Sequence, residues 1–75
     1  MNIEIKCFAT LAAYAPSGGV VPDVPEGADV ASIMALLRVP PDEVKIIFVN
    51  GTHAEPDAVL HDGDRVGLFP AVGGG

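Results

Sequence analysis

The stretch that decides the fold is Leu60-His61-Asp62-Gly63-Asp64-Arg65-Val66-Gly67-Leu68-Phe69-Pro70-Ala71-Val72-Gly73-Gly74-Gly75, which ends the 75-residue sequence. An Asp-Gly-Asp turn precedes an alternating strand at 65–69, and Pro70 is expected to end the ladder of that strand because it has no N–H. The glycines that follow have no Cβ and accept most φ and ψ values. We therefore expect a flexible tail over 70–75 whose terminal carboxylate can lie in a narrow groove of another protein. A glycine run is also typical of a simple flexible end.

Length and composition predict one small domain, residues 1–75, with a thin core. Apolar residues make up 49% of the chain, yet no uninterrupted run approaches the roughly 18 residues that span a membrane. The 4 basic and 10 acidic residues give a formal net charge of −6, which disfavours nucleic acid and anionic membrane surfaces as partners. The first residues lack the features of a signal peptide, so we expect a cytoplasmic protein that is monomeric when free.

Apolar patterning predicts the secondary structure. Alternating or continuous apolar runs predict five strands, at 2–7, 20–24, 44–49, 52–54 and 65–69. Asn50-Gly51 is typical of a type I′ hairpin turn between the third and fourth of these strands.

One helix is predicted at 30–38, with Asp29 as its N-cap. Its apolar stripe is expected to consist of Val30, Ile33, Leu36 and Leu37. Such a helix is long enough only to cover one face of a sheet.

Four segments, spread over nearly the whole chain, carry a resemblance to a known family. They are Cys7-Phe8-Ala9-Thr10-Leu11, Val49-Asn50-Gly51, Leu60 to Val66, and Phe69-Pro70-Ala71-Val72-Gly73-Gly74-Gly75. Together they resemble the sulfur carriers ThiS and MoaD of thiamine and molybdopterin synthesis. The long first loop and the Phe-Pro-Ala-Val ending are more similar to MoaD, the small subunit of molybdopterin synthase. The resemblance implies an α+β, β-grasp (ubiquitin-like) fold: a mixed sheet of four to five strands, one covering helix and a flexible C-terminal Gly-Gly tail.

The resemblance also implies a function, in which the protein is a carrier and not an enzyme. An E1-like adenylyltransferase of the MoeB/ThiF type would adenylate the C-terminal carboxylate of Gly75 with ATP and Mg²⁺. A sulfur donor would then convert it to a thiocarboxylate, and the sulfur would pass to an acceptor held by the molybdopterin synthase large subunit. The chain has no phosphate-binding loop of its own, so we expect ATP to bind to the partner and no cofactor to bind here.

Four alternatives stay open. A tungstopterin pathway would use the same chemistry, and a ThiS-type carrier would instead supply thiazole synthase for thiamine. A ubiquitin-like modifier would be joined through Gly75 to a lysine of a target protein. An interaction domain with an inert glycine tail would not be activated by ATP at all.

The tail residues have distinct expected roles. Gly73 and Gly74 let the backbone pass through a channel too narrow for Cβ atoms, and Val72 offers one apolar anchor. The chemistry itself is expected at the Gly75 carboxylate.

A partner-binding patch is predicted beside the tail from strand alternation. If Ile47 faces the helix, then Ile46 and Phe48 face outward, and so does Phe69 in the last strand. Together with Pro70, these residues would form an exposed apolar patch of the kind that binds other proteins. A register shift of one residue would reverse every assignment.

Other candidate chemistry is weaker. The single Cys7 lies on the apolar side of its strand, so a small buried residue is favoured over a reactive thiol. His53 and His61 show no zinc-ligand spacing, and no metal site is predicted.

Overall fold

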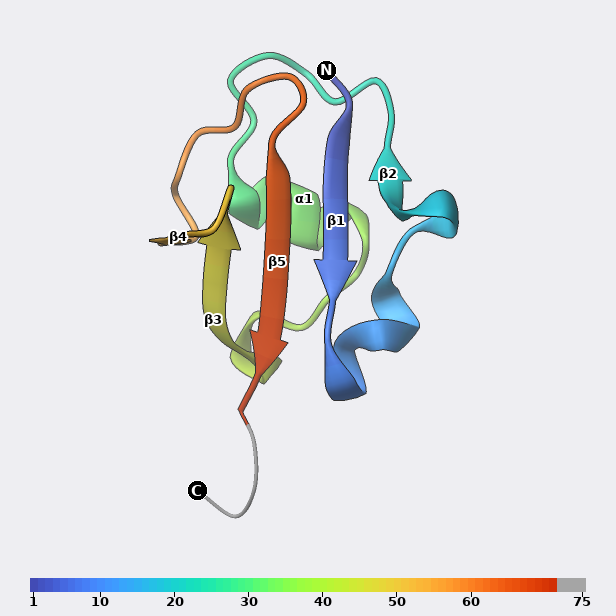
Figure 1. Cartoon of the computed structure of the whole chain (residues 1–75), viewed down its shortest axis with the longest axis vertical. Coiled ribbons are helices and arrows are strands. Elements are labelled where there is room, and N and C mark those ends of the chain that lie inside the picture. Colours follow the sequence, from blue (N-terminus) through green and yellow to red (C-terminus); the bar gives the residue numbers. More distant parts are fainter. Residues whose placement is uncertain (72–75) are drawn as a thin grey trace.

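A mixed five-stranded sheet is covered on one face by a single α-helix in this computed structural model, which describes residues 1–71 (Figure 1). The strands are β1 (Ile3–Cys7), β2 (Val20–Val21), β3 (Val44–Val49), β4 (Thr52–Ala54) and β5 (Arg65–Pro70). Their order across the sheet is β2-β1-β5-β3-β4. The first and last strands of the chain, β1 and β5, lie side by side and parallel, whereas the other neighbouring pairs are antiparallel. The predicted combination of mixed sheet and one helix is confirmed.

The core lies between the sheet and the helix α1 (Val30–Leu36), which is behind the sheet in Figure 1. Alternate residues of β1 and β5 point into it, as the period of two in their sequences predicted. The buried core side chains are those of Ile3, Ile5, Leu11, Val21, Val24, Val30, Ile33, Met34, Val39, Ile47, Leu60, Val66 and Leu68.

The helix α1 begins where the sequence predicted. The Asp29 carboxylate accepts hydrogen bonds from the Ser32 N–H at 2.8 Å and the Ser32 hydroxyl at 2.7 Å. These bonds cap the helix, and the hydrogen bond from the Ser32 side chain is the main cause that lowers the pKa of Asp29.

The predicted apolar stripe of the helix was wrong at one position. Val30, Ile33 and Met34 are buried, whereas Leu36 is 64% exposed. The core-facing positions follow the i, i+3, i+4, i+7 pattern, which continues to the half-buried Leu37 and leaves Leu36 on the flank of the helix.

The helix also ends earlier than predicted, at Leu36 with Leu37 as the C-cap. Arg38 adopts a left-handed conformation (φ 62°) and donates its N–H to Ala35 O at 3.1 Å, while Val39 donates to Met34 O at 2.9 Å. This pair of bonds is a Schellman motif, with arginine at the position that glycine usually occupies.

The strand and turn connections largely match the predictions. Asn50 and Gly51 both have positive φ (52° and 81°), as a type I′ turn requires, and they join β3 to β4. The strand β2 is shorter than the predicted 20–24, ending at Val21. The β1–β2 connection contains a 3₁₀ segment, Ala9–Tyr14, and a turn at Ser17–Gly19 in which both glycines have positive φ. Another 3₁₀ segment, Pro41–Glu43, leads into β3.

The turn before β5 is fixed by side-chain hydrogen bonds. Asp64 accepts one bond from the Asn50 side-chain amide at 2.9 Å and another from the His61 N–H at 2.8 Å. Asn50 in turn accepts from the Arg65 N–H at 3.0 Å. The hydrogen bond from Asn50 is the main cause that lowers the pKa of Asp64. These bonds tie the start of β5 to the hairpin beside it.

Pro70 ends the ladder of β5, as expected, but the prediction that it begins the tail was wrong. It is buried, is the last residue of β5 and lies opposite Val44 across the sheet. A β-bulge between Val44 and Ile46 accommodates this end of the pairing. Proline is tolerated here because it stands at the end of the ladder. The segment that follows the fold therefore starts at Ala71. No helix in the described part of the chain is long and apolar enough to cross a membrane.

Candidate functional site

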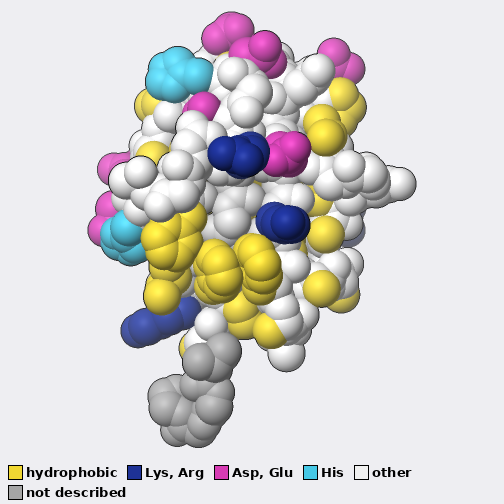
Figure 2. Space-filling view, in the orientation of Figure 1, with side chains coloured by type: hydrophobic (Ala, Val, Ile, Leu, Met, Phe, Trp, Pro, Cys, Tyr) yellow, Lys and Arg dark blue, Asp and Glu magenta, His cyan; other side chains and the backbone are white. Residues whose placement is uncertain are grey.

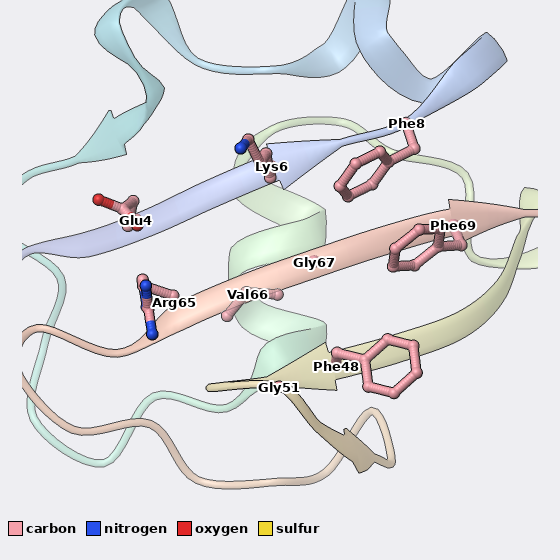
Figure 3. A pocket seen from close by; sticks show the side chains of 9 residues that line it. All are labelled: Glu4, Lys6, Phe8, Phe48, Gly51, Arg65, Val66, Gly67 and Phe69. Carbon is pink, nitrogen blue, oxygen red and sulfur yellow. The ribbon is translucent and has the colours of Figure 1, made fainter.

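Three phenylalanines lie together on the face of the sheet that the helix leaves open, and we call them the aromatic cluster: Phe8, Phe48 and Phe69 (Figure 3). The Phe8 and Phe69 rings are stacked, with centroids 4.2 Å apart and planes at 5°. Phe48 meets Phe69 edge-on, at 5.6 Å and 85°. The rings come from three neighbouring strands or their ends, so the sheet itself sets their spacing.

The space under the rings exists because Gly67 has no side chain. A Cβ atom on Gly67 would lie 3.4 Å from Cε1 of Phe69, 3.8 Å from Cε2 of Phe8 and 3.9 Å from Cβ of Phe48. Glycine weakens a strand by itself, and rings packed over it recover part of that loss. The aromatic cluster is therefore built around one residue of β5.

Phe8 was missed as a site residue by the sequence-based prediction. Its position two residues after Lys6 in an alternating strand could have placed it on the open face. Its contact with Phe69 depends on the parallel pairing of β1 with β5, in which Cys7 lies opposite Leu68 and Phe8 donates its N–H to Leu68 O at 3.1 Å. Local sequence does not reveal that pairing.

The predicted patch residues lie where strand alternation placed them, except for Pro70. Ile46 is 38% exposed and lies opposite Phe69 in the register of β3 with β5. Phe48 and Phe69 are half-buried and face away from the helix, on the side opposite to buried Ile47. Pro70 is buried and does not contribute to the exposed surface. Whether these residues bind a partner stays a prediction.

Charged residues adjoin the aromatic cluster. A hollow on the open face is lined by the aromatic cluster, Gly51, Val66 and Gly67 together with Glu4, Lys6 and Arg65. Figure 2 shows hydrophobic side chains gathered over one part of this face, with Lys and Arg side chains next to them. The member of the aromatic cluster that belongs to β5, Phe69, lies near the carboxyl end of that strand, two residues before Ala71.

The tail residues singled out by the sequence, Val72, Gly73, Gly74 and Gly75, lie outside the described residues. Their roles in threading and in activation therefore remain predictions.

Comparison with protein families identifies the chain. The model of the ThiS family matches residues 5–75, from within β1 through the four other strands to the glycine run. The chain belongs to the ThiS family. Comparison with curated proteins gave no match.

Solved structures similar to this ThiS family member share its whole architecture. SAMP1 from Haloferax volcanii is 30% identical, with a TM-score of 0.73 and 100% of each chain covered. The putative molybdopterin converting factor subunit 1 from Pyrococcus furiosus is 27% identical, with a TM-score of 0.70, and the match covers 96% of this chain and 99% of that one. A chain in the complex of molybdopterin-converting factor subunits 1 and 2 from Helicobacter pylori is 22% identical, with a TM-score of 0.60 and full coverage of both chains, which shows a shared fold.

These matches confirm the β-grasp fold and the predicted resemblance. The ThiS family member described here has the ubiquitin-like fold of the small sulfur carriers and modifiers. Members of this family are small carrier proteins.

The cysteine and the two histidines of this ThiS family member have structural surroundings that account for them. Cys7 is half-buried against the core, and burial raises the pKa of its thiol, which disfavours the nucleophilic thiolate. His61 is 3.9 Å from Asp64 at an exposed turn, and His53 packs edge-on to Phe48 at 6.2 Å. Within residues 1–71, no group of three or more His, Cys, Asp or Glu side chains is placed to hold a metal ion.

Proposed function

We propose that this protein is a sulfur carrier whose Gly75 carboxylate is activated by an E1-like enzyme and converted to a thiocarboxylate. The observation that supports this most is the match to the ThiS family model, which continues through the glycines at 73–75. The aromatic cluster adds a surface suited to docking near the end of β5, which is followed by Ala71, the last residue that the structure describes.

The activation step needs ATP because a carboxylate is a poor electrophile. The Gly75 carboxylate attacks the α-phosphate of ATP, which forms the acyl-adenylate and releases pyrophosphate. The partner supplies the ATP site and Mg²⁺. This chain supplies the carboxylate and a glycine backbone that is narrow enough to enter the ATP site of the partner.

The sulfur step replaces AMP. The terminal sulfur of a persulfide on the donor attacks the Gly75 carbonyl, so that a C–S bond forms and the C–O bond to AMP breaks. The intermediate is an acyl disulfide, in which the transferred sulfur is still bonded to the cysteine sulfur of the donor. A second thiol of the donor then attacks that cysteine sulfur. This releases the thiocarboxylate and leaves a disulfide on the donor.

Docking through the open face is consistent with this chemistry. The side chains of Phe8 and Ile46 are 37% and 38% exposed, next to the half-buried rings of Phe48 and Phe69. Exposed aromatic and aliphatic groups of this kind commonly anchor protein interfaces. A partner that covers them would hold the end of β5 in a fixed position relative to its own active site.

Molybdopterin or tungstopterin synthesis is the pathway that we favour. The Pyrococcus furiosus protein that is 27% identical carries the name of a molybdopterin converting factor subunit. The similar Helicobacter pylori protein is found in a complex with a second subunit. We infer that this chain also pairs with a larger subunit that holds the sulfur acceptor. A thiamine-type carrier would have the same fold and tail.

Protein modification is the second candidate function. It is supported by the similarity to SAMP1, one of whose structures is described as a small archaeal modifier protein and is 29% identical to this chain. In this case the Gly75 acyl group passes from the adenylate to an enzyme thiol and then to a lysine amine, or directly to the amine. AMP leaves as the C–O bond breaks, and an isopeptide bond forms between Gly75 and the lysine.

Mass spectrometry separates the two functions. The protein, purified from its native cells with the E1-like enzyme intact, should carry a mass increase equal to the exchange of one oxygen for sulfur at its C-terminus. A ladder of isopeptide-linked conjugates would instead support modification. An unmodified C-terminus after incubation with the enzyme, ATP, Mg²⁺ and a sulfur donor would contradict the carrier function, and the absence of pyrophosphate release in that incubation would contradict both.

Two variants test the role of the tail. Deletion of Gly75, or Gly74→Phe, should abolish formation of the adenylate while leaving the thermal unfolding curve of the protein unchanged. Val59→Ala, at an exposed position remote from the end of β5, is the matched control and should be adenylated normally. Normal adenylation of the Gly75 deletion would contradict the proposal.

A further inference from the structure

Two basic residues adjoin the aromatic cluster in a protein that is otherwise acidic. Lys6 of β1 lies two residues before Phe8, on the same open face of the sheet, and Arg65 precedes Gly67 on that face in β5 (Figure 3). Both line the hollow in which the aromatic cluster lies. The chain has only 4 basic residues against 10 acidic ones, so half of its basic side chains are on this surface.

These two cations are not neutralised by ion pairs among residues 1–71. The single close contact found there between a basic and an acidic side chain is that of His61 with Asp64, at 3.9 Å. Glu4 is the one carboxylate that lines the hollow, and it lies opposite Arg65 in the register of β1 with β5. With Lys6 and Arg65 positive and Glu4 negative, the surface carries a local charge of +1, in contrast to the net charge of −6.

We propose that Lys6 and Arg65 make this surface selective for partner proteins that present carboxylates around an apolar patch. The inference rests on the proposed function, in which a partner docks over the aromatic cluster. Such a partner covers the two cations as well, because they border the same hollow. Covering an unpaired charge removes its hydration, which costs free energy. A partner without matching carboxylates would therefore bind more weakly.

The chemistry of the surface favours an acidic protein over a polyanion such as nucleic acid or phosphate-rich membrane. A guanidinium binds a carboxylate through two parallel hydrogen bonds, and the aromatic cluster needs apolar side chains opposite it. Two cations beside Glu4, on a molecule of charge −6, would not attract a densely charged phosphate backbone.

The test compares substitutions that change the total charge equally. Lys6→Gln and Arg65→Gln each remove one positive charge from the surface, whereas Arg38→Gln removes one beyond the end of α1, the helix that covers the opposite face. Association of each variant with the E1-like enzyme of the same organism is measured by stopped-flow fluorescence at several salt concentrations. All three positions are exposed, so thermal unfolding serves as a check on folding.

We expect Lys6→Gln and Arg65→Gln to slow association about threefold or more at low salt and to flatten its salt dependence, because charges at an interface act mainly on the association rate. Glu4→Gln should accelerate association, and Arg38→Gln should stay close to the unsubstituted protein.

If Lys6→Gln and Arg65→Gln match Arg38→Gln, the inference is wrong. Adenylation is measured in parallel at saturating enzyme, and it distinguishes failure of the charge-selectivity inference from failure of the proposed function. An unsubstituted protein that is adenylated, with equal association rates among the three variants, overturns only the charge selectivity. An unsubstituted protein that neither binds nor is adenylated overturns both.

Discussion

Gly67 shows how one residue can determine a surface. Three phenylalanines pack over the position where its side chain would be, and a Cβ there would lie at ordinary van der Waals distance from the nearest ring atom, 3.4 Å away. A methyl group therefore fits, but anything larger must displace the Phe8 or Phe69 ring.

We predict that Gly67→Ala keeps partner binding within about twofold, whereas Gly67→Leu weakens it tenfold or more because the rings can no longer stack. Isothermal titration with the E1-like enzyme measures the affinity, and ring-proton chemical shifts report the stacking. Equal affinity of the two variants would show that the arrangement of the rings is unimportant for docking.

Asp64 has a structural role, because its carboxylate connects the turn before β5 to Asn50. Hydrogen bonds to the ionised form hold the pKa of Asp64 below its ordinary value of 3.8 in the folded protein. The stabilisation is therefore fully present above the unfolded pKa and is lost as the pH falls through the lower, folded pKa.

We predict that Asp64→Asn lowers the unfolding free energy by about 1 kcal/mol at neutral pH, because the new amide cannot accept both hydrogen bonds in the same way. The difference from the unsubstituted protein should shrink at an acid pH below the lowered, folded pKa of Asp64, where its carboxyl becomes protonated. Urea unfolding at the two pH values measures this. A difference that does not depend on pH would mean that the carboxylate charge contributes nothing.

Among the elements, the end of α1 carries local strain. Arg38 occupies the left-handed position of the Schellman motif with φ 62°, a conformation that costs a residue with a Cβ about 1 kcal/mol or more.

We predict that Arg38→Gly raises the unfolding free energy by about 0.5 kcal/mol, since the relief of strain exceeds the small loss of the favourable charge near the helix C-terminus. Thermal or urea unfolding measures the change. Arg38→Ala is the control and should not stabilise the protein, because alanine keeps the Cβ that causes the strain. Stabilisation of both variants to the same extent would refute the explanation.

The elements themselves could be predicted from local sequence, because their signals are short-range. Asp29 predicted the start of the helix, and Asn50-Gly51 predicted the hairpin. The errors arose where distant parts of the chain decide the outcome. Leu36 had the right spacing from Ile33 but lies on a flank that nothing covers, and Pro70 is buried because the start of β3 lies against it.

The aromatic cluster could be predicted only in part for the same reason. Alternation placed Phe48 and Phe69 on the open face, but Phe8 joins them through the pairing of β1 with β5, which are about sixty residues apart in the chain. No local pattern indicates that two strands at opposite ends of a sequence become neighbours. Topology determines that contact.

For the whole molecule, the parallel pairing of β1 with β5 has a mechanical consequence. Tension applied at Met1 and Ala71 pulls these neighbouring strands along their length in opposite directions, so the ladder from Glu4–Arg65 to Cys7–Leu68 is loaded in shear. Tension applied at Glu43 and Ala71 instead peels β5 from antiparallel β3 one hydrogen bond at a time. Single-molecule pulling should therefore find a clearly higher rupture force for the first pair of attachment points. An enzyme that pulls on the carboxyl end while the amino end is held therefore loads the domain in the stronger of these two directions.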